Sequence, residues 1–271
     1  MLKQRVITAL ILAPLTLWGL FGLSAEHFIW FISAVVLIAS WEWADLSGSS
    51  TLGRVLYPAA MGLMLYGLEQ VRTPELDLNI LIFAALGWAA ALYAVSCYPK
   101  TPFWSSTSAR LLMGLAVLIP CWVGFVELRT SFWLGKDELL YVLLLVWTAD
   151  VGAYFFGRRY GNKKLAPKVS PGKSWAGVYG GLFATSVLAL FASLYWQLSV
   201  LNTLTLILIT LVVTAVSVLG DLLESMVKRH RGLKDSSHLL PGHGGVMDRI
   251  DSLTAAAPIF VLSLKLTGLT L

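Results

Sequence analysis

Four aspartates in the second half of the chain lie in or beside long apolar stretches, where an ionisable side chain needs a partner or a function. Asp150 stands within the apolar run 139–156, Asp221 ends another, and Asp248 and Asp251 open the last one. Four carboxylates converging from three helices would repel one another without a cation. Because hard oxygen ligands suit Mg²⁺, which also binds substrate phosphates, the spacing predicts a magnesium site built from these four residues.

Helical spacing divides these acids between two stripes. Asp221, Glu224 and Lys228 fall on one stripe, and Asp248 and Asp251 fall on another, because residues three and four apart share a helix face. A structural explanation stays open for part of the set. Glu224 can form an ordinary ion pair with Lys228, and Asp248 can pair with a neighbouring basic group.

Two polar segments in this half favour phosphate binding. In 164–177, Ser170-Pro-Gly-Lys173 is typical of a tight turn, and the helix that follows presents free N–H groups that attract anions. Lys168 and Lys173 add positive charge suited to phosphate. The glycine spacing is not that of a Walker loop, and any basic turn between two spans has some of these features.

The second segment is Pro241-Gly-His243-Gly-Gly245, an unusual turn whose glycines permit close backbone approach to a ligand. It leads directly into Asp248. His243 is either a phosphate contact or acid–base group, or an ordinary polar loop residue. Earlier in the chain, Trp41 and Trp43 suit anchors at a membrane interface, and Glu42 between them is left without an assigned role.

Composition requires membrane-spanning helices to position these residues. The 271 residues are 57% hydrophobic and 13% charged, against about 25% charged in a soluble domain. A spanning helix needs about 20 mostly apolar residues. The sequence predicts an all-α polytopic membrane protein with about nine such spans: 6–23, 28–46, 53–70, 79–97, 110–126, 138–157, 175–196, 202–224 and 249–269.

The distribution of lysine and arginine orients these spans. With the N-terminus in the cytoplasm, sixteen of the twenty basic residues fall on the cytoplasmic side, as the positive-inside rule requires. The net charge of +5 therefore reflects topology and not a nucleic-acid partner. The loops 158–174 and 228–248 carry most of the basic residues, and such loops attract lipid headgroups or nucleotide phosphates.

Other classes of protein account for these features less well. A lipid or ion transporter explains intramembrane acids without catalysis, but it predicts carboxylates near the bilayer midplane and leaves the basic turns unexplained. A structural scaffold gives no reason for buried acids. A CDP-alcohol phosphotransferase would contain the motif Asp-x-x-Asp-Gly-x-x-Ala-Arg, which the sequence lacks.

The C-terminal motifs resemble the signature of the phosphatidate cytidylyltransferases, also called CDP-diacylglycerol synthases. The resemblance rests on Ser225-Met-Val-Lys228-Arg229, on Lys234-Asp235, and on Pro241–Gly245 followed by Asp248-Arg249-Ile-Asp251. Trp147–Gly161, Lys164–Gly177, Leu2–Arg5 and Trp41–Trp43 are also similar to the family. The resemblance covers essentially the whole chain and is strongest from about residue 139 onward.

The resemblance implies the reaction CTP + phosphatidate → CDP-diacylglycerol + pyrophosphate, with Mg²⁺ as cofactor and a second cation left open. It also implies a multi-pass protein of the bacterial inner membrane whose active site faces the cytoplasm. On this basis Asp221 and Asp248 bind metal, with Asp150 or Asp251 completing the site. The expected catalytic residues are Asp221, Asp248, Lys173 and Arg249, and the expected substrate-binding residues are Lys168, Ser170, Lys173, Lys228, Arg229, His243, Gly244 and Gly245.

These motifs divide the single membrane domain into two segments. Residues 131–271 hold the predicted catalytic helices and loops, whereas 1–130 are expected to anchor the protein and to offer surface for a homodimer contact.

Overall fold

Nine helices and one short hairpin make up the part of the chain that the computed structural model describes, residues 2–101, 103–130 and 135–271. In chain order they are α1 (Leu2–Gly22), α2 (Ala25–Leu46), α3 (Thr51–Val71), α4 (Pro74–Cys97), α5 (Thr107–Thr130), α6 (Gly135–Tyr160), β1 (Lys164–Ala166), β2 (Ser170–Ser174), α7 (Trp175–Tyr195), α8 (Val200–His230) and α9 (Met247–Thr267). Each predicted span coincides with one of these helices. The prediction of an essentially all-α chain is confirmed, with the hairpin as a small addition.

Seven of the described helices are long and apolar enough to cross a membrane: α2 and α4 to α9. The chain is therefore a multi-pass membrane protein. Among the described residues, Leu10–Gly22 of α1 forms a shorter apolar stretch. The total of nine spans and the side on which the N-terminus lies stay predictions.

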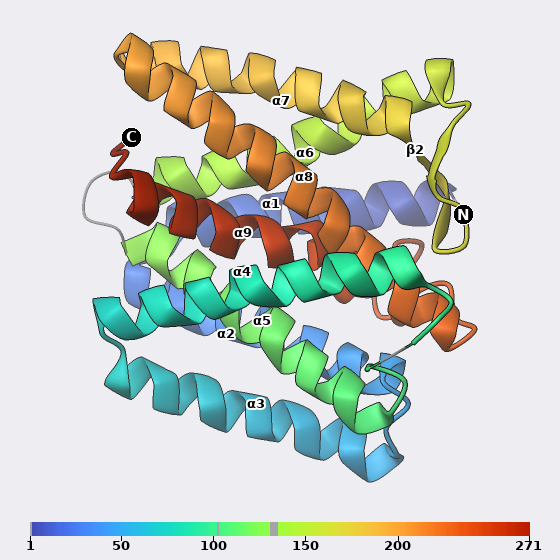
Figure 1. Ribbon diagram of the computed structural model, residues 1–271. Helices are drawn as coiled ribbons and strands as arrows, with labels where there is room; N and C mark the ends of the chain where they lie inside the picture. The colour runs from blue at the N-terminus through green and yellow to red at the C-terminus, as the bar shows by residue number, and fades with distance from the viewer. Residues whose placement is uncertain (1, 102, 131–134) are drawn as a thin grey trace.

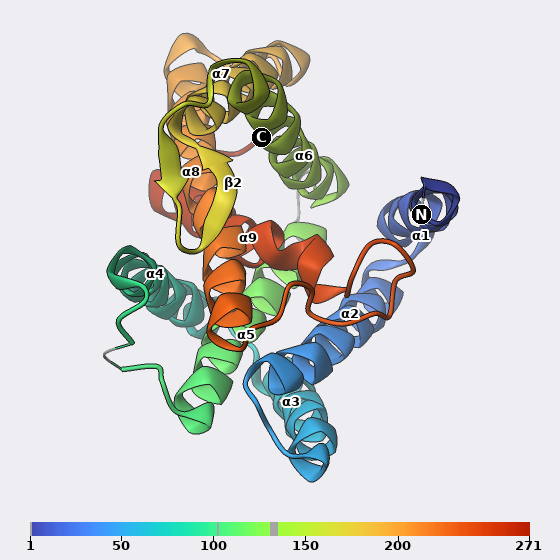
Figure 2. The same cartoon turned by 90° about the vertical axis from the view of Figure 1, so that its right-hand side faces the viewer.

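The helices lie side by side, with their ends gathered at two faces (Figure 1). One face, here called the hairpin face, carries the start of α1, the β-hairpin, the connections 47–50 and 231–246, and residues 98–101 and 103–106 between α4 and α5. Seen from this face, the connection between α8 and α9 crosses the end of α2 and reaches toward α1 (Figure 2), where Thr8 Oγ1 donates a hydrogen bond to the carbonyl of Pro241 at 2.8 Å. All the connections that the charge pattern groups on one side of the membrane thus meet at one face.

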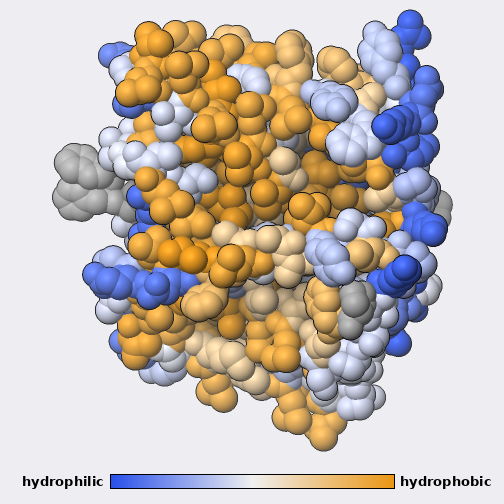
Figure 3. Space-filling model, in the orientation of Figure 1, coloured by the Kyte–Doolittle hydropathy of each residue, from blue (hydrophilic) through white to orange (hydrophobic). Residues whose placement is uncertain are grey.

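The surface has the distribution of a protein embedded in lipid. Figure 3 shows hydrophobic side chains across the middle of the molecule, with hydrophilic ones concentrated at the hairpin face and a smaller group at the opposite face. Many large apolar side chains are exposed on this surface, among them Phe83, Phe191 and Leu204. Such exposure would promote aggregation in water, but it is ordinary in a bilayer.

Six of the described helices begin after a serine or threonine that caps the first turn. The side-chain oxygens of Ser24, Ser50, Thr73, Ser106, Ser174 and Ser199 each accept a hydrogen bond from the N–H three residues later. Such a cap satisfies a backbone donor that has no partner within the helix. Helix α9 differs, because its N-cap residue is Val246, whose side chain cannot accept a hydrogen bond. The first N–H groups of α9 must therefore find acceptors elsewhere.

Small residues bring α6, α7 and α8 close together. A Cβ atom at Gly181 of α7 would lie 3.1 Å from the carbonyl oxygen of Ala149 in α6, so glycine permits an approach that a larger residue would block. Thr214 Oγ1 of α8 donates to Thr185 Oγ1 of α7 at 2.9 Å. Packing and hydroxyl bonds thus hold these three helices as one group.

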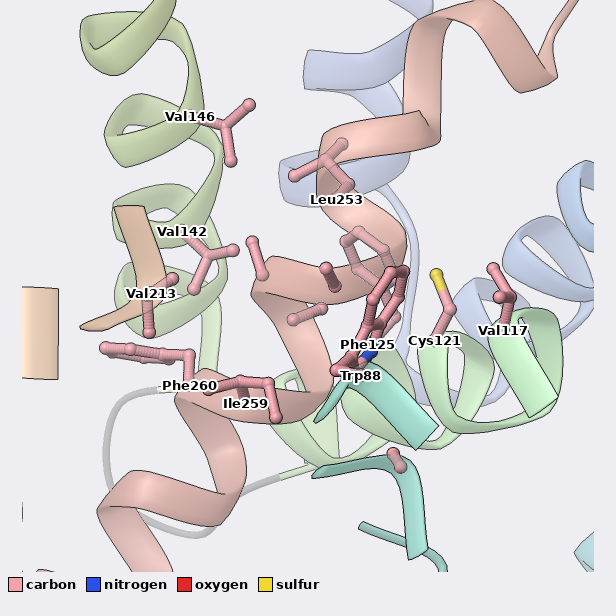
Figure 4. Packing of buried hydrophobic residues seen from close by; sticks show 14 of the residues in the cluster. Trp88, Val117, Cys121, Phe125, Val142, Val146, Val213, Leu253, Ile259 and Phe260 are labelled. Atoms are coloured by element: carbon pink, nitrogen blue, oxygen red, sulfur yellow. The ribbon is translucent and has the colours of Figure 1, made fainter. Parts of the chain in front are cut away.

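The centre of the molecule is filled from both halves of the chain. Trp88 of α4 and Phe125 of α5 lie on one side of α9, whereas Phe260 of α9 points to the other side, toward Val142 of α6 and Val213 of α8 (Figure 4). Helices of the segment 1–130 therefore contact helices of the segment 131–271 directly. The division at residue 131 falls at 131–134, outside the described residues, and stays a prediction.

At the face opposite the hairpin, an ion-pair cluster joins several helices. Arg72 Nη2 lies 2.8 Å from Asp77 Oδ2 and 3.4 Å from Glu127 Oε1, and Lys265 Nζ lies 2.9 Å from Glu127 Oε2. Asp77 is only 2% exposed. Because a buried charge is tolerated when it is paired, this cluster holds α4, α5 and α9 together far from the hairpin face.

Candidate active site

A cavity of about 400 Å³ lies between α6, α7, α8 and the β-hairpin. Its charged lining residues are Asp150, Arg158, Lys173 and Asp221. Thr214 and Val218 line it further from the hairpin face, together with small residues of α6 and α7. The cavity is therefore charged at the hairpin face and largely apolar toward the interior, which suits an amphiphilic ligand.

Asp221 is at the centre of the charged part of this cavity. Its Oδ2 lies 2.6 Å from Lys173 Nζ, and its Oδ1 accepts a hydrogen bond from Ser225 Oγ at 3.1 Å. Asp150 and Asp251 both lie close enough to Asp221 and Lys173 to interact with them electrostatically. The structure thus brings together three of the four predicted carboxylates, from α6, α8 and α9, around one lysine.

The chemistry of this donor set fits Mg²⁺. Within the described residues, no group of three or more His, Cys, Asp or Glu side chains is assembled closely enough to hold a metal by itself. Mg²⁺ does not require such a group, because it commonly takes one or two carboxylates and completes its shell with water and phosphate oxygens. Asp221 and Asp150 offer such a pair, since Asp150 forms no hydrogen bond or ion pair with another described residue.

The β-hairpin positions Lys173 at the cavity. Strands β1 and β2 pair antiparallel, with Lys164 opposite Ser174 and Ala166 opposite Ser170. The prediction of a tight turn at Ser170–Lys173 was wrong, because these residues pair with β1 as strand β2 and the turn lies at 167–169. Ser174 then caps α7. Lys168 is exposed in the turn and Ser170 begins β2, and neither residue lines the cavity.

Arg229, at the end of α8, fastens this hairpin. Its Nε donates to the carbonyl oxygen of Val169 in the hairpin turn at 3.4 Å, and its Nη1 donates to the carbonyl of Leu233 at 3.1 Å. Arg229 remains exposed beyond these bonds. It therefore joins the two basic segments at the hairpin face.

Asp248 and Lys228 lie in a separate buried cluster. Lys228 Nζ is 2.5 Å from Asp248 Oδ1 and 3.1 Å from Glu224 Oε2, and the three side chains are 9%, 6% and 0% exposed. Both structural pairs that the sequence left open are therefore formed. Lys228 does not line the cavity, and contact with a substrate would require this cluster to open.

The second oxygen of Asp248 closes the glycine turn. Oδ2 accepts hydrogen bonds from the backbone N–H groups of Ser236 and Gly245, both at 2.8 Å, and from Ser236 Oγ at 2.9 Å. Gly244 has φ +80°, and a Cβ atom there would lie 2.5 Å from Asp248 Oδ2. Glycine is thus required for this turn, as its sequence predicted. His243 lies within it, half-buried, with its Nδ1 buried and without a hydrogen-bond partner among the described residues.

Substitution of Gly245 by alanine is expected to destabilise the folded protein by about 1–3 kcal/mol, the usual range for overpacking. A Cβ atom at Gly245 would clash with Ser236 Oγ and with the carboxylate of Glu42. Thermal unfolding in detergent measures the effect. Gly67→Ala is the matched control, because a Cβ atom there meets nothing within 4 Å. Equal melting temperatures for the two variants would contradict the expectation.

Two arginines lie in or beside the cavity. Arg249 is exposed on the first turn of α9 and lies close enough to Asp150 to interact with it electrostatically. Arg158 lines the cavity and donates to the hydroxyl of Tyr154 at 3.2 Å, although the sequence analysis used it only as a basic residue that orients the spans.

Trp43, expected at the membrane interface, is instead fully buried, with its Nε1 donating to the carbonyl of Arg110 at 2.7 Å. That interpretation of Trp43 was wrong, because the end of α2 packs inside the protein.

A polytopic helical protein with a charged cavity at one face is the class that fold and site define. Residues 3–267 match the Cytidylyltransferase family, and the chain belongs to it. It is 48% identical to the phosphatidate cytidylyltransferase of Pseudomonas aeruginosa over 99% of this chain and 98% of the relative. The corresponding protein of Haemophilus influenzae is 43% identical, covering 96% and 97% of the two chains, and that of Bacillus subtilis is 32% identical, covering 98% of each.

Proposed function

We propose that this protein is a phosphatidate cytidylyltransferase, which transfers the cytidylyl group of CTP to phosphatidate and releases pyrophosphate. The observation that carries this proposal is the similarity over nearly the full length to relatives of that name. The cavity supports it, since its charged end suits phosphates and its apolar end suits the glycerol and acyl chains of a lipid. The product is CDP-diacylglycerol.

In this reaction a phosphate oxygen of phosphatidate attacks the α-phosphorus of CTP. The new oxygen–phosphorus bond forms as the bond to the pyrophosphate oxygen breaks, and the electron pair leaves with pyrophosphate. The nucleophile is already anionic, so the protein needs little general-base chemistry and contributes mainly by positioning and by neutralising charge. Lys173 and Arg158 in the cavity, with Arg249 beside it, would hold the phosphates.

Mg²⁺ is part of this proposal. Asp221 and Asp150 would hold the ion, which when bound would supply positive charge to the phosphate oxygens. Asp248 has a different role, because both of its oxygens are already engaged. Oδ1 pairs with Lys228, and Oδ2 accepts hydrogen bonds from the N–H groups of Ser236 and Gly245. It would support the glycine turn, and ligation of a metal by Asp248 would require the ion pair to Lys228 to be exchanged.

The proposed location is the bacterial inner membrane, with the hairpin face toward the cytoplasm. CTP is a soluble cytoplasmic nucleotide, and the basic connections gathered at this face follow the positive-inside rule. The phosphate of phosphatidate lies at the depth of the helix ends, so the lipid need not leave the bilayer. A transporter would instead use carboxylates near the midplane of the bilayer. Asp221 pairs with Lys173 of the β-hairpin, and this hairpin lies at the ends of the helices.

Purified protein in mixed detergent–phosphatidate micelles with labelled CTP tests the proposal. We expect labelled CDP-diacylglycerol and an equal amount of pyrophosphate in the presence of Mg²⁺, and neither when EDTA replaces the metal. Product formed equally well in EDTA would contradict the metal assignment alone. Folded protein that binds phosphatidate but forms no product under any condition would refute the enzymatic function and direct work to transport in vesicles.

A further inference from the structure

Glu42 of α2 is a buried carboxylate with a complete set of hydrogen bonds to a distant part of the chain. Its side chain is 0% exposed. Oε1 accepts from the Val246 N–H at 2.9 Å and from Ser237 Oγ at 2.6 Å, while Oε2 accepts from the Met247 N–H at 2.6 Å. Ser236 Oγ lies 3.1 Å from Oε2 and 2.9 Å from Asp248 Oδ2, so these two carboxylates share its single proton. Each oxygen of Glu42 thus receives one backbone donor and contacts one hydroxyl.

The two backbone donors belong to the start of α9, the helix whose own N-cap residue lacks an acceptor. Val246 is that N-cap residue and Met247 begins the helix. The carboxylate of Glu42 therefore replaces the missing cap from another helix, and its negative charge suits a helix N-terminus. The bonds to Ser236 and Ser237 hold the other end of the same connection, so one side chain fixes both ends of the segment 236–247.

We propose that Glu42 is a positioning residue of the active site, a cap supplied by α2 that fixes the first turn of α9. That turn carries Asp248, Arg249 and Asp251, and the glycine turn 241–245 directly precedes it. The inference rests on the proposed cytidylyltransferase function. It gives the N-terminal half of the chain a part in the chemistry beyond anchoring.

A carboxylate is needed here because of the pattern of donors. In a Glu42→Gln variant, one oxygen becomes an NH₂ group that must face a backbone N–H, whichever way the amide turns. One hydrogen bond from a backbone N–H is lost, and the amide NH₂ group and that N–H then face each other as two donors. Glu42→Asp keeps both acceptors and the charge but shortens the side chain by one methylene. The glutamine variant is therefore expected to be the more severe of the two.

Steady-state kinetics on the purified full-length protein test the proposal. We expect Glu42→Gln to lower kcat and raise the KM for CTP, each on the order of tenfold, as displaced supporting groups do. The KM for phosphatidate should change less, because the apolar part of the cavity that suits its acyl chains is built from α6, α7 and α8. Loss of folded protein alone lowers the apparent kcat and moves neither KM, so the KM for CTP separates positioning from stability.

Two further variants keep the test decisive. Asp77→Asn alters an equally buried carboxylate, paired with Arg72 at the opposite face, and should leave the KM for CTP unchanged. Ser237→Ala removes one hydroxyl donor to Glu42 without touching its charge and should raise that KM by a smaller factor. Unchanged KM values for CTP in Glu42→Asp, Glu42→Gln and Ser237→Ala would overturn the inference while wild-type activity stands. Absence of wild-type product would overturn the proposed function instead.

Discussion

Replacement of Asp221 by asparagine is expected to lower kcat for CDP-diacylglycerol formation about 10²- to 10³-fold, the usual loss when one preorganised charged group of an active site is removed. Asparagine keeps the shape of the side chain and can still accept a hydrogen bond from Ser225. It removes the charge that pairs with Lys173 at 2.6 Å. Because the side chain is 29% exposed, the protein should still fold, and initial rates at saturating substrates measure the effect directly.

Lys173→Met distinguishes the two roles that Asp221 could have. If Asp221 only holds Lys173, both single variants and the double variant lose the same activity, since the interaction is already absent in each. If Asp221 also binds Mg²⁺, as proposed, Asp221→Asn raises the Mg²⁺ concentration needed for half-maximal rate, whereas Lys173→Met does not. A Mg²⁺ titration that gives the same midpoint for wild type and Asp221→Asn would exclude the metal role.

The transmembrane architecture follows from composition, because each apolar run long enough to span a bilayer has little choice but to be helical. The ends of the helices were less predictable. The sequence places the end of the eighth span at residue 224, yet α8 continues to His230. The buried cluster of Glu224, Lys228 and Asp248 stabilises this continuation. Because these residues are charged, hydropathy alone predicts that they lie in a loop.

The residue types of the site could be predicted, but not their division into groups. Helical spacing puts Asp221 and Lys228 on one stripe, although Asp221 faces the cavity and Lys228 faces a packed interface two turns later. Which carboxylate meets the cavity depends on how α8 and α9 pack against each other, and no local pattern records that. Asp248 and Asp251 likewise separate, one into the turn and the other toward Asp221.

Glu42 shows the limit of sequence reasoning most clearly. It lies 194 residues from Ser236, and the local setting between two tryptophans indicates a membrane interface. The signal that could have found it is indirect: α9 begins without a serine, threonine, aspartate or asparagine at its N-cap position. A helix that carries several site residues in its first turn needs its N–H groups satisfied, so a missing local cap predicts a partner from elsewhere.

Removal of Lys228 is expected to have the largest effect on stability. Lys228→Met leaves Glu224 and Asp248 buried without their shared cation, and breaking such a pair costs about 3–5 kcal/mol. At roughly 2–4 °C per kcal/mol, the melting temperature in detergent should fall by about 10 °C. Lys168→Met, which removes an exposed lysine of the hairpin turn, is the control and should change it little.

A second substitution separates the structural role of Lys228 from substrate binding. Glu224 Oε1 is already buried without a partner among the described residues, so the charge of Glu224 is the costly part once Lys228 is gone. Glu224→Gln combined with Lys228→Met should therefore recover much of the lost stability, because a neutral amide replaces an unpaired charge. If activity returns with stability, Lys228 acts through the fold, holding Asp248 and the glycine turn. If the double variant is stable but inactive, Lys228 contacts the substrate, and the cluster must open during the catalytic cycle.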